Sequence, residues 1–467
     1  MKLHIVELGA KNKSDANRVL APIPNSQITQ RNKMSWYQKR YPGRIACVAV
    51  ATIGLAFSLA GASVAANAAP GQVLYSAPES LSSTQSDPYL PSRIEAQVES
   101  PGAFGAVFSP DGKFMYVADA LQGGNTASVF RTSDLAKVAS LQRPNGEYVN
   151  SVAASPDGKY VYAAGPLGMI TRYSTDGWNQ VDTPSATVID VEPDKNHQVT
   201  NAALFEIKLS ADGKALYATN YLIGNNSLVT IDVSTDQWQE SQIRAVAPGW
   251  PHLLALSPDG KKAYAAWKGA SGVEIFDLEA GSAKEVNSAH EANDFALPAG
   301  DMAMSPSGDV FLISKYGLLT RVHNDEKAAT VLTKGAAGGQ LNRSIALTPD
   351  GKYVVTAGGL FVEVYEAQNL SDDSTPVAVY ENSTASIGLA MGGEGERVYA
   401  SDLNGAINVL DLRNIPDSPD TPYQLPVQSI AGDGTTDPSY VRGYPSIDGK
   451  SVFFTRNTKG LVTKVSL

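Results

Sequence analysis

The sequence predicts an all-β protein built from eight copies of one four-stranded unit. Three observations predict this fold class: a five-residue turn phrase that recurs along the chain, apolar segments of strand length on both sides of each copy, and a spacing of 43 to 55 residues between copies. A period in this range is typical of the blades of a β-propeller. We therefore predict an eight-bladed β-propeller with four antiparallel strands per blade. A seven-bladed ring with one aberrant copy is the alternative.

The turn phrase has the form Ser-Pro-Asp-Gly-Lys, as in residues 109–113. Its Pro presets φ near −65°, its Asp can accept hydrogen bonds from the following backbone, and its Gly accepts a positive φ. These are the requirements of a hairpin turn, so each copy should join the first two strands of a blade. The glycines of the eight copies, of which the last two lie in weaker phrases, are Gly112, Gly158, Gly213, Gly260, Gly308, Gly351, Gly395 and Gly449.

Four strand-length segments recur in each copy. Small residues precede the turn phrase, as in 152–154, and suit the crowded innermost strand of a propeller. A Tyr-containing segment follows the phrase, as in 161–164, and then a third segment with strand-like alternation, as in 228–233. A less regular fourth strand follows, as in 138–141. Each copy therefore predicts one blade.

The two ends of the repeat region predict how the ring closes. The eighth copy ends with its third strand, near residues 461–467, and residues 93–99 stand before the first copy where a fourth strand would be expected. We expect residues 93–99 to complete the last blade. Closure by strands from both ends leaves few free sheet edges.

The N-terminus has the layout of a secretory signal peptide with a long n-region. Three basic residues between 39 and 44 precede an apolar run from 45 to about 59, and small residues lead to the Ala-Asn-Ala of 66–68. Cleavage after Ala68 would export the protein to the periplasm or the cell exterior; an uncleaved anchor is the alternative. The predicted organisation is a signal peptide over 1–68, an N-terminal tail over 69–92 and the propeller over 93–467.

The mature chain is expected to lack cysteine and to be acidic. Cys47, the single cysteine, lies in the predicted signal peptide, so disulfides, thiolate metal sites and Cys nucleophiles are excluded. Residues 1–68 hold 9 of the 37 Lys and Arg and 2 of the 47 Asp and Glu, which leaves 28 basic and 45 acidic residues and a net charge of −17. Such a surface repels nucleic acid. We predict no nucleic-acid partner and no membrane span in the mature chain.

The run Ser-Pro-Asp-Gly-Lys-x-x-Tyr-Val-Ala resembles the YVTN-type β-propeller repeat of secreted bacterial and archaeal proteins. The resemblance covers residues 93–467, although the fifth, seventh and eighth copies depart from the strict pattern. It implies a propeller and leaves the function open. Similar repeats occur in surface-layer proteins, periplasmic binding proteins, lactonase-like enzymes, amine dehydrogenase large subunits and haem d1 domains.

Candidate site residues come from the segments that enter the innermost strands, because propellers bind ligands in the axial funnel that these segments line. Convergent titratable side chains in a cleft are typical of a functional site. Polar residues at a wet funnel mouth, however, need no function. The candidates, four to six positions before each turn phrase, are Phe104, Asn150, Ser151, Glu206, His252, Asp301, Asn342, Arg343, Tyr440 and Arg442, with Trp250 just upstream of His252.

Chemical roles follow from the side-chain types. His252 is the candidate general base, with Glu206 or Asp301 as its catalytic partner. Arg343 and Arg442 are candidates to bind a carboxylate or an oxyanion. No closely spaced histidine pair, nucleophile elbow or P-loop occurs, so no metal and no cofactor is predicted. The other ligand-binding candidates are Asn150, Trp250, Asn342 and Tyr440.

A second candidate surface lies at the blade rim. Trp178 and Trp238 fall in loops between the third and fourth strands of adjacent blades. An exposed Trp pair could bind a sugar or a partner protein. The alternative is that each ring packs over its own blade.

Three functions fit these observations. The first is an exported binding or scaffold propeller that uses its funnel or rim for a small ligand or a protein partner. The second is a cofactor-free or metal-assisted hydrolase or lyase, lactonase-like, acting at the funnel. The third is the large non-catalytic subunit of an amine-dehydrogenase-like complex. The sequence favours the first and does not decide whether the chain is an enzyme.

Overall fold

The computed structural model separates into two units, Met1–Ala68 and Ala69–Leu467. The predicted signal peptide lies outside the described residues. The described residues are 73–75, 92–120, 126–143, 148–165, 168–176, 186–190, 204–220, 226–235, 238–246, 250–268, 272–286, 299–334, 343–392, 395–417, 419–432 and 441–466.

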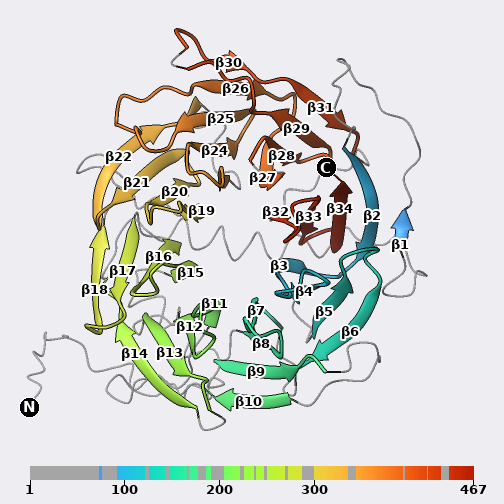
Figure 1. Ribbon diagram of the computed structural model, residues 1–467, viewed down its shortest axis with the longest axis vertical. Coiled ribbons are helices and arrows are strands. Elements are labelled where there is room, and N and C mark those ends of the chain that lie inside the picture. The colour runs from blue at the N-terminus through green and yellow to red at the C-terminus, as the bar shows by residue number, and fades with distance from the viewer. Residues whose placement is uncertain are drawn as a thin grey trace, which may run out of the picture. The chain divides into compact units, whose positions relative to one another are not determined.

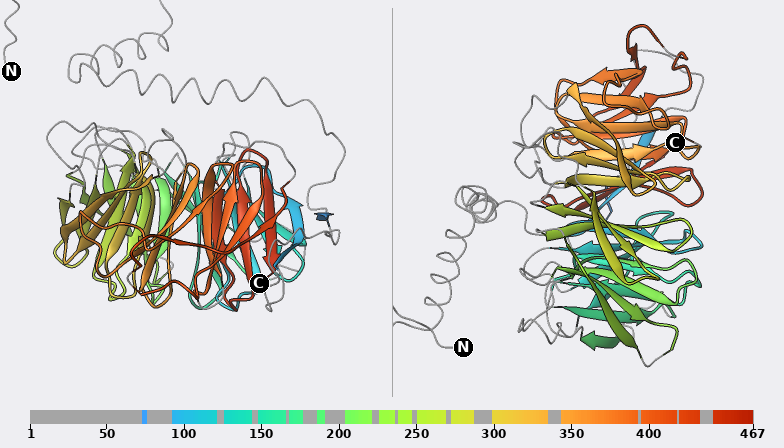
Figure 2. Two further views of the ribbon diagram at one scale, coloured as in Figure 1. Left: turned by 90° about the horizontal axis from the view of Figure 1, so that it is seen from above. Right: turned by 90° about the vertical axis from the view of Figure 1, so that its left-hand side faces the viewer.

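The second unit is a closed ring of eight blades, and each blade contains four antiparallel strands, consecutive in the chain in blades 1 to 6 (Figure 1). The innermost strands, among them β7, β11 and β15, surround the centre of the ring, and β10, β14 and β18 lie at its outside (Figure 1). In the two side views the strands run across the thickness of the ring (Figure 2). The predicted fold class, with eight blades rather than seven, is confirmed.

In each of the first four blades the strands follow in chain order from the inside outward. Blade 1 has β3 (Ala103–Phe108), β4 (Phe114–Asp119), β5 (Thr126–Arg131) and β6 (Lys137–Gln142). Blade 2 has β7 (Ser151–Ala154), β8 (Tyr160–Ala164), β9 (Met169–Ser174) and β10 (Ala186–Asp190). Blade 3 has β11 (Leu204–Leu209), β12 (Ala215–Asn220), β13 (Ser227–Asp232) and β14 (Gln239–Arg244). Blade 4 has β15 (Trp250–Leu256), β16 (Lys262–Lys268), β17 (Val273–Asp277) and β18 (Ser282–Val286).

The remaining four blades follow in chain order. Blade 5 has β19 (Ala299–Met304), β20 (Val310–Ser314), β21 (Leu318–His323) and β22 (Glu326–Leu332). Blade 6 has β23 (Ser344–Leu347), β24 (Tyr353–Gly358), β25 (Phe361–Glu366) and β26 (Ala378–Glu381). Blade 7 has β27 (Ser386–Gly392), β28 (Arg397–Asp402), β29 (Ile407–Asp411) and β31 (Val427–Ile430). Blade 8 has β32 (Val441–Pro445), β33 (Ser451–Arg456), β34 (Leu461–Ser466) and, from the other end of the repeat region, β2 (Arg93–Glu99).

The ring closes as predicted. β2 pairs antiparallel with β34, from Arg93 opposite Ser466 to Glu99 opposite Leu461. Two short strands extend outer edges: β1 (Val73–Tyr75) pairs with β2, and β30 (Tyr423–Gln424), from the connection between β29 and β31, runs parallel to β26 of blade 6. Among the described residues, no helix has the length and apolar character needed to cross a membrane.

The core lies between the blades. Each of the eight hydrophobic clusters among the described residues combines side chains of two neighbouring blades, so all eight blade interfaces are apolar. Between blades 4 and 5, for example, Tyr264 and Ile275 pack with Val310 and Leu312. Burial of these faces is the main favourable contribution to folding, because the hydrophobic effect grows with apolar area removed from water.

The turn phrase has the local bonding that its residues predict. In blade 1 the Ser109 hydroxyl donates to Asp111 Oδ1 at 2.7 Å, the Lys113 amide donates to the same oxygen at 3.1 Å, and the Phe114 amide donates to Ser109 Oγ at 3.0 Å. The same three bonds recur in blades 2, 3, 4, 6 and 8. The Ser109 hydrogen bond is the largest of the effects that lower the pKa of Asp111 to about 2.

Candidate ligand site in the axial channel

The innermost strands are irregular where they start. The pairing of β3, β11, β15, β19 and β27 with their neighbours shifts register near the first residues of each strand. Such bulges interrupt the ladder and leave a backbone group without its strand partner. A buried amide must then find another acceptor, because an unsatisfied N–H destabilises the fold.

Side chains of the preceding blade supply these acceptors. Ser151 Oγ of blade 2 accepts from the Ile207 amide of blade 3 at 3.3 Å, and Ser344 Oγ of blade 6 accepts from the Leu389 amide of blade 7 at 3.2 Å. We call these contacts inter-blade hydrogen bonds. In each of them the acceptor stands four positions before its own turn phrase. We call this the inner-ring position, and its eight occupants are Gly105, Ser151, Glu206, Leu253, Asp301, Ser344, Gly388 and Arg442.

Glu206 and Asp301, the predicted carboxylate partners of His252, make the same kind of bond. Glu206 Oε2 accepts from the Leu254 amide at 3.1 Å. Asp301 Oδ2 accepts from the Ile345 amide at 3.1 Å and from the Ser344 hydroxyl at 2.9 Å. Burial raises the pKa of Asp301, while Arg442 and these hydrogen bonds act in the opposite direction. Both carboxylates thus hold neighbouring blades together.

Arg442 is the one inner-ring residue with a cationic side chain. Its guanidinium lies 4.8 Å from the centre of the Phe104 ring, within cation–π range. Burial in the channel acts to lower the pKa of Arg442, but Tyr444, Glu206 and Asp301 raise it overall. Within the described part of the chain, Arg442 forms no ion pair closer than 4.0 Å. The cation is therefore stabilised by an aromatic face and, through space, by the nearby Glu206 and Asp301 carboxylates.

Aromatic rings connect Arg442 to His252. Phe104 meets Phe205 edge to face with 6.0 Å between ring centres, and Phe205 meets His252 in the same way at 6.0 Å. His252 is buried, with 9% of its surface exposed. Neither Glu206 nor Asp301 hydrogen-bonds to His252 in the described structure. The structure therefore brings His252 and its two alternative carboxylate partners to one channel without a hydrogen bond from either carboxylate to His252.

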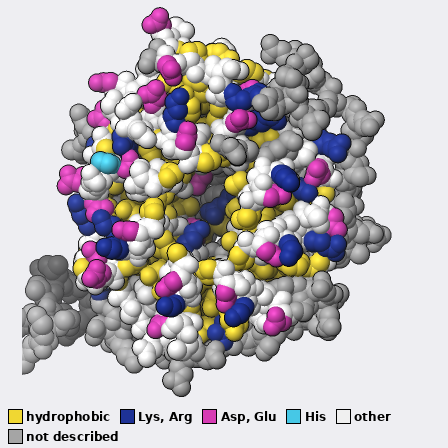
Figure 3. Space-filling view, viewed as in Figure 1, with side chains coloured by type: hydrophobic (Ala, Val, Ile, Leu, Met, Phe, Trp, Pro, Cys, Tyr) yellow, Lys and Arg dark blue, Asp and Glu magenta, His cyan; other side chains and the backbone are white. Residues whose placement is uncertain are grey.

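A cavity of about 300 Å³ lies in the channel beside Arg442. Tyr444, Ser151, Glu206 and Lys208 contribute polar atoms to its wall, and small residues of β3 and β7 contribute apolar surface. Figure 3 shows the hollow at the centre of the ring, with basic side chains inside it. Arg442, Glu206 and Ser151 are thus three sequence-predicted residues that share one cavity.

Other predicted residues have structural contacts. Arg343 is buried; its Nε donates to the Lys315 carbonyl at 2.8 Å, and burial lowers its pKa to about 10. Asn150 Nδ2 donates to the Leu204 carbonyl at 2.8 Å, so it links blades 2 and 3. Trp250 begins β15, but its side chain is outside the described set, as are Asn342 and Tyr440.

Lys208, Tyr444 and Phe205 were missed by the sequence analysis. Lys208 and Tyr444 each stand two residues beyond an inner-ring residue. Alternate residues of a strand share a face, so this spacing indicates that Lys208 and Tyr444 face the same way as the inner-ring residues before them. Phe205 stands one residue before Glu206, at the position occupied in blade 1 by Phe104, so extending that column of the repeat would have found it.

At the rim, Trp238 packs against the neighbouring blade. Its ring lies 5.9 Å from that of Tyr162 in blade 2, and the Arg172 guanidinium is 4.9 Å from the Trp238 ring centre. Trp238 contributes to the apolar cluster between blades 2 and 3. Trp178 lies outside the described residues.

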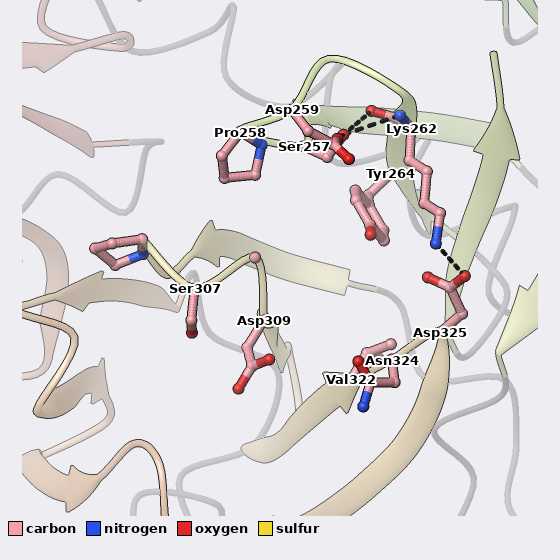
Figure 4. Close-up of a pocket in the computed structure, with 12 residues that line it drawn as sticks. Ser257, Pro258, Asp259, Lys262, Tyr264, Ser307, Asp309, Val322, Asn324 and Asp325 are labelled. Atoms are coloured by element: carbon pink, nitrogen blue, oxygen red, sulfur yellow. Dashed lines mark hydrogen bonds and ion pairs between the residues drawn. The ribbon is translucent and has the colours of Figure 1, made fainter. Parts of the chain in front are cut away.

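A second cavity, of about 320 Å³, opens between the turns of blades 4 and 5. Lys262 forms an ion pair with Asp325 on one side of it, and Asp309 and Ser307 lie on the other (Figure 4). The Asp309 carboxylate accepts from Arg321 Nη2 at 2.7 Å. The signal in the sequence is that blade 5 has Asp309 where the turn phrase has Lys. No group of three or more His, Cys, Asp or Glu able to hold a metal ion occurs among the described residues.

Fold and channel together define a class: an eight-bladed β-propeller with a charged axial cavity. A model of the family described as "Lactonase, 7-bladed beta-propeller" matches residues 95–295, which is less than half of the chain. No curated protein matches the chain.

Solved structures show the same fold. The propeller of Dos1 superposes with a TM-score of 0.58 at 13% identity, over 80% of this chain and 95% of that one. The C-terminal WD40 domain of Sif2 gives a TM-score of 0.56 at 13% identity, over 80% of this chain and 99% of that one. At this identity the likeness shows the fold alone.

Proposed function

We propose that this chain is an exported binding protein that holds a small ligand in its axial channel. The observation that carries the proposal is Arg442, a guanidinium placed on the inner ring beside a cavity and without a carboxylate in ion-pair contact in the described structure. Arg442 is partly exposed to the channel, so its guanidinium can contact a molecule in the cavity. A bound ligand would supply an ion-pair partner, and a cavity of about 300 Å³ is at the small end of the range of ligand sites.

The test is to ask whether the channel retains a molecule. The protein purified from the cell that makes it is analysed by native and denaturing mass spectrometry, together with its Arg442→Met variant and an Arg131→Met control. Arg131 is exposed and pairs with Asp134 at 3.1 Å on the surface, so it controls for loss of one positive charge. We expect a small molecule bound to wild type and control and lost from Arg442→Met. Equal retention by all three proteins would contradict a channel site.

Export is part of the proposal and has its own test. The basic residues between 39 and 44, the apolar run after them and the Ala-Asn-Ala of 66–68 support it. We expect the intact mass of the secreted protein to correspond to a chain beginning at Ala69. A full-length chain found only inside the cell would contradict export.

A lactonase-like hydrolase is the second candidate, favoured by the family match over residues 95–295. His252 would be its base, with Glu206 or Asp301 in support. Because both carboxylates already accept backbone hydrogen bonds, the geometry favours binding over this catalysis. Hydrolysis of simple lactones followed by titration, with His252→Ala and a fold check by circular dichroism, decides the point. Activity that His252→Ala abolishes without unfolding would establish the enzyme.

A further inference from the structure

The side-chain oxygens of Ser151 and Glu206, which line the channel cavity, already make contacts within the protein. Ser151 Oγ accepts from the Ile207 amide, and Glu206 Oε2 accepts from the Leu254 amide. The other oxygen of Glu206 lies 3.2 Å from Lys208 Nζ. A ligand that needed to donate hydrogen bonds would therefore compete with contacts that hold the blades together.

In blade 8 the side chain that accepts an amide hydrogen bond from the next blade is Tyr444. Its phenol oxygen accepts from the Ala106 amide at 3.0 Å, and its hydroxyl lies 3.4 Å from the Phe104 carbonyl as a donor. Tyr444 thus closes the ring between blades 8 and 1 where Arg442, which has no acceptor atom, cannot. Its oxygen is consequently occupied on the side that faces blade 1.

The hydrogen-bond donors of the cavity wall, in contrast, are more numerous than their contacts within the protein. A guanidinium has five N–H groups, and Arg442 makes no ion pair with any described residue. Lys208 is 46% exposed and has ammonium hydrogens beyond the one directed at Glu206. The charged side chains that line the cavity are Arg442, Lys208 and Glu206, two cations and one anion; the Asp301 carboxylate acts on Arg442 from outside this lining. This wall suits an anion.

The rest of the cavity suits a compact apolar body. Gly105 has no side chain, and a Cβ there would meet only the Asn150 carbonyl, at 3.7 Å, so the inner ring is open beside Arg442. Ala106, Ala153 and Ala154 line the same space. Small side chains at these positions leave room that large ones would fill.

We infer that the ligand of the channel is a small organic carboxylate, bound through its two oxygens to the Arg442 guanidinium, with its apolar part against the alanine wall. This inference rests on the proposed function and narrows it to one charge class. Guanidinium and carboxylate match in shape and form paired, charge-assisted hydrogen bonds. The exposed ammonium of Lys208 adds attraction at longer range.

The test uses three probes of nearly equal shape: benzoate, neutral benzamide and cationic benzamidine. Binding to the purified protein is measured by calorimetry at low salt, because salt screens charge attraction. We expect benzoate to bind at least 10-fold more tightly than either of the other probes. Arg442→Met should weaken benzoate about 10- to 100-fold, in line with the loss of hydrogen bonds to a charged group, and should leave benzamide unchanged.

If Arg442→Met unfolds, two further variants still test whether positive charge at the cavity is needed for benzoate binding. Lys208→Met changes an exposed side chain and should weaken benzoate a few-fold, and Arg131→Met should have no effect. Tighter binding of benzamide or benzamidine at the same site would overturn the carboxylate assignment while the binding function stood. Failure of all three probes would also overturn it. The binding function itself is judged separately, by the co-purified molecule and its dependence on Arg442.

Discussion

Substituting Asp301 with Ala should destabilise the ring at the interface of blades 5 and 6. The Asp301 carboxylate accepts from the Ser344 hydroxyl, the Ile345 amide and, through Oδ1, the Met302 amide at 2.9 Å. Removing it leaves three donors without their acceptor in the interior of the channel. The effect should appear in stability, because the carboxylate joins two blades.

The magnitude follows from these three bonds. Each is worth about 1 kcal/mol net, and a buried donor left unsatisfied can cost about 1–3 kcal/mol. Removing a desolvated carboxylate offsets part of this loss, so we expect a decrease of about 2–4 kcal/mol in the free energy of unfolding. With an unfolding entropy of about 2.1 cal/mol/K per residue, a propeller of this length should melt about 3–5 °C lower.

The assay is thermal and urea unfolding followed by circular dichroism, with Asp417→Ala as the matched control. Asp417 also carries a carboxylate, but its side chain is 97% exposed and its pairing with Lys352 is at 3.8 Å. Exposed pairs contribute little, so the control should melt with the wild type. Coincident melting of Asp301→Ala and Asp417→Ala would refute the reasoning that inter-blade hydrogen bonds stabilise the ring.

Two further predictions concern a turn and a buried acid. Gly213 and Gly260 have almost the same φ, 70° and 69°, but a Cβ on Gly213 would lie 2.9 Å from Pro156 Cδ, whereas one on Gly260 would meet nothing within 4 Å. Gly260→Ala should therefore lower the free energy of unfolding by about 1–2 kcal/mol through backbone strain, and Gly213→Ala should lower it further through the contact with Pro156. Equal decreases for the two variants would contradict the packing argument. Burial raises the pKa of Asp119 to about 6, so the folded state binds more protons than the unfolded state between about pH 4 and 6, and stability falls as pH rises through this window. In urea titrations at several pH values, Asp119→Asn should reduce the fall in the free energy of unfolding across this window by up to about 3 kcal/mol. The same fall in wild type and variant would show that Asp119 does not cause it.

The fold was predictable because its signals are local and repeated. In six of the eight copies the turn phrase specifies a hairpin through Ser or Thr, Asp and Gly within five residues, and all eight copies keep the Gly. Eight copies in one chain leave little choice of architecture. The closing strand could be predicted because a fourth strand was missing at one end and a spare one was present at the other. Residues 93–99 then occupied the place that the repeat left open.

The candidate site was predictable in position but not in bonding. Counting back from the turn phrase placed Glu206, Asp301 and Arg442 in the channel, because the repeat fixes which residue stands at the inner ring. Their partners could not be predicted, because each one is a backbone amide of the next blade, and nothing in the turn phrase marks which amide lacks a partner within its own sheet. Arg343 shows the same limit: its Nε donates to a carbonyl of the preceding blade, a contact between residues 28 positions apart.

Blade 8 differs from blades 2 and 6 in which side chain makes the inter-blade hydrogen bond. At Ser151 and Ser344 the inner-ring hydroxyl accepts the amide of the next blade, at 3.3 and 3.2 Å. Arg442 cannot accept a hydrogen bond, and Tyr444 does so in its place. Tyr444 thus fills the structural role at this interface, while the inner-ring position of blade 8 holds a cation.

A double-mutant cycle follows from this exchange. Tyr444→Phe alone should cost about 1–3 kcal/mol, because the Ala106 amide loses its acceptor. Adding Arg442→Ser should restore part of that stability, since a serine at the inner ring would accept the amide as Ser151 does, giving a favourable coupling of at least about 0.5 kcal/mol. The doubly substituted protein should at the same time fail to bind benzoate. Additive losses of stability would show that Tyr444 does not replace an inner-ring acceptor, and retained benzoate binding would show that Arg442 is not the anion's partner.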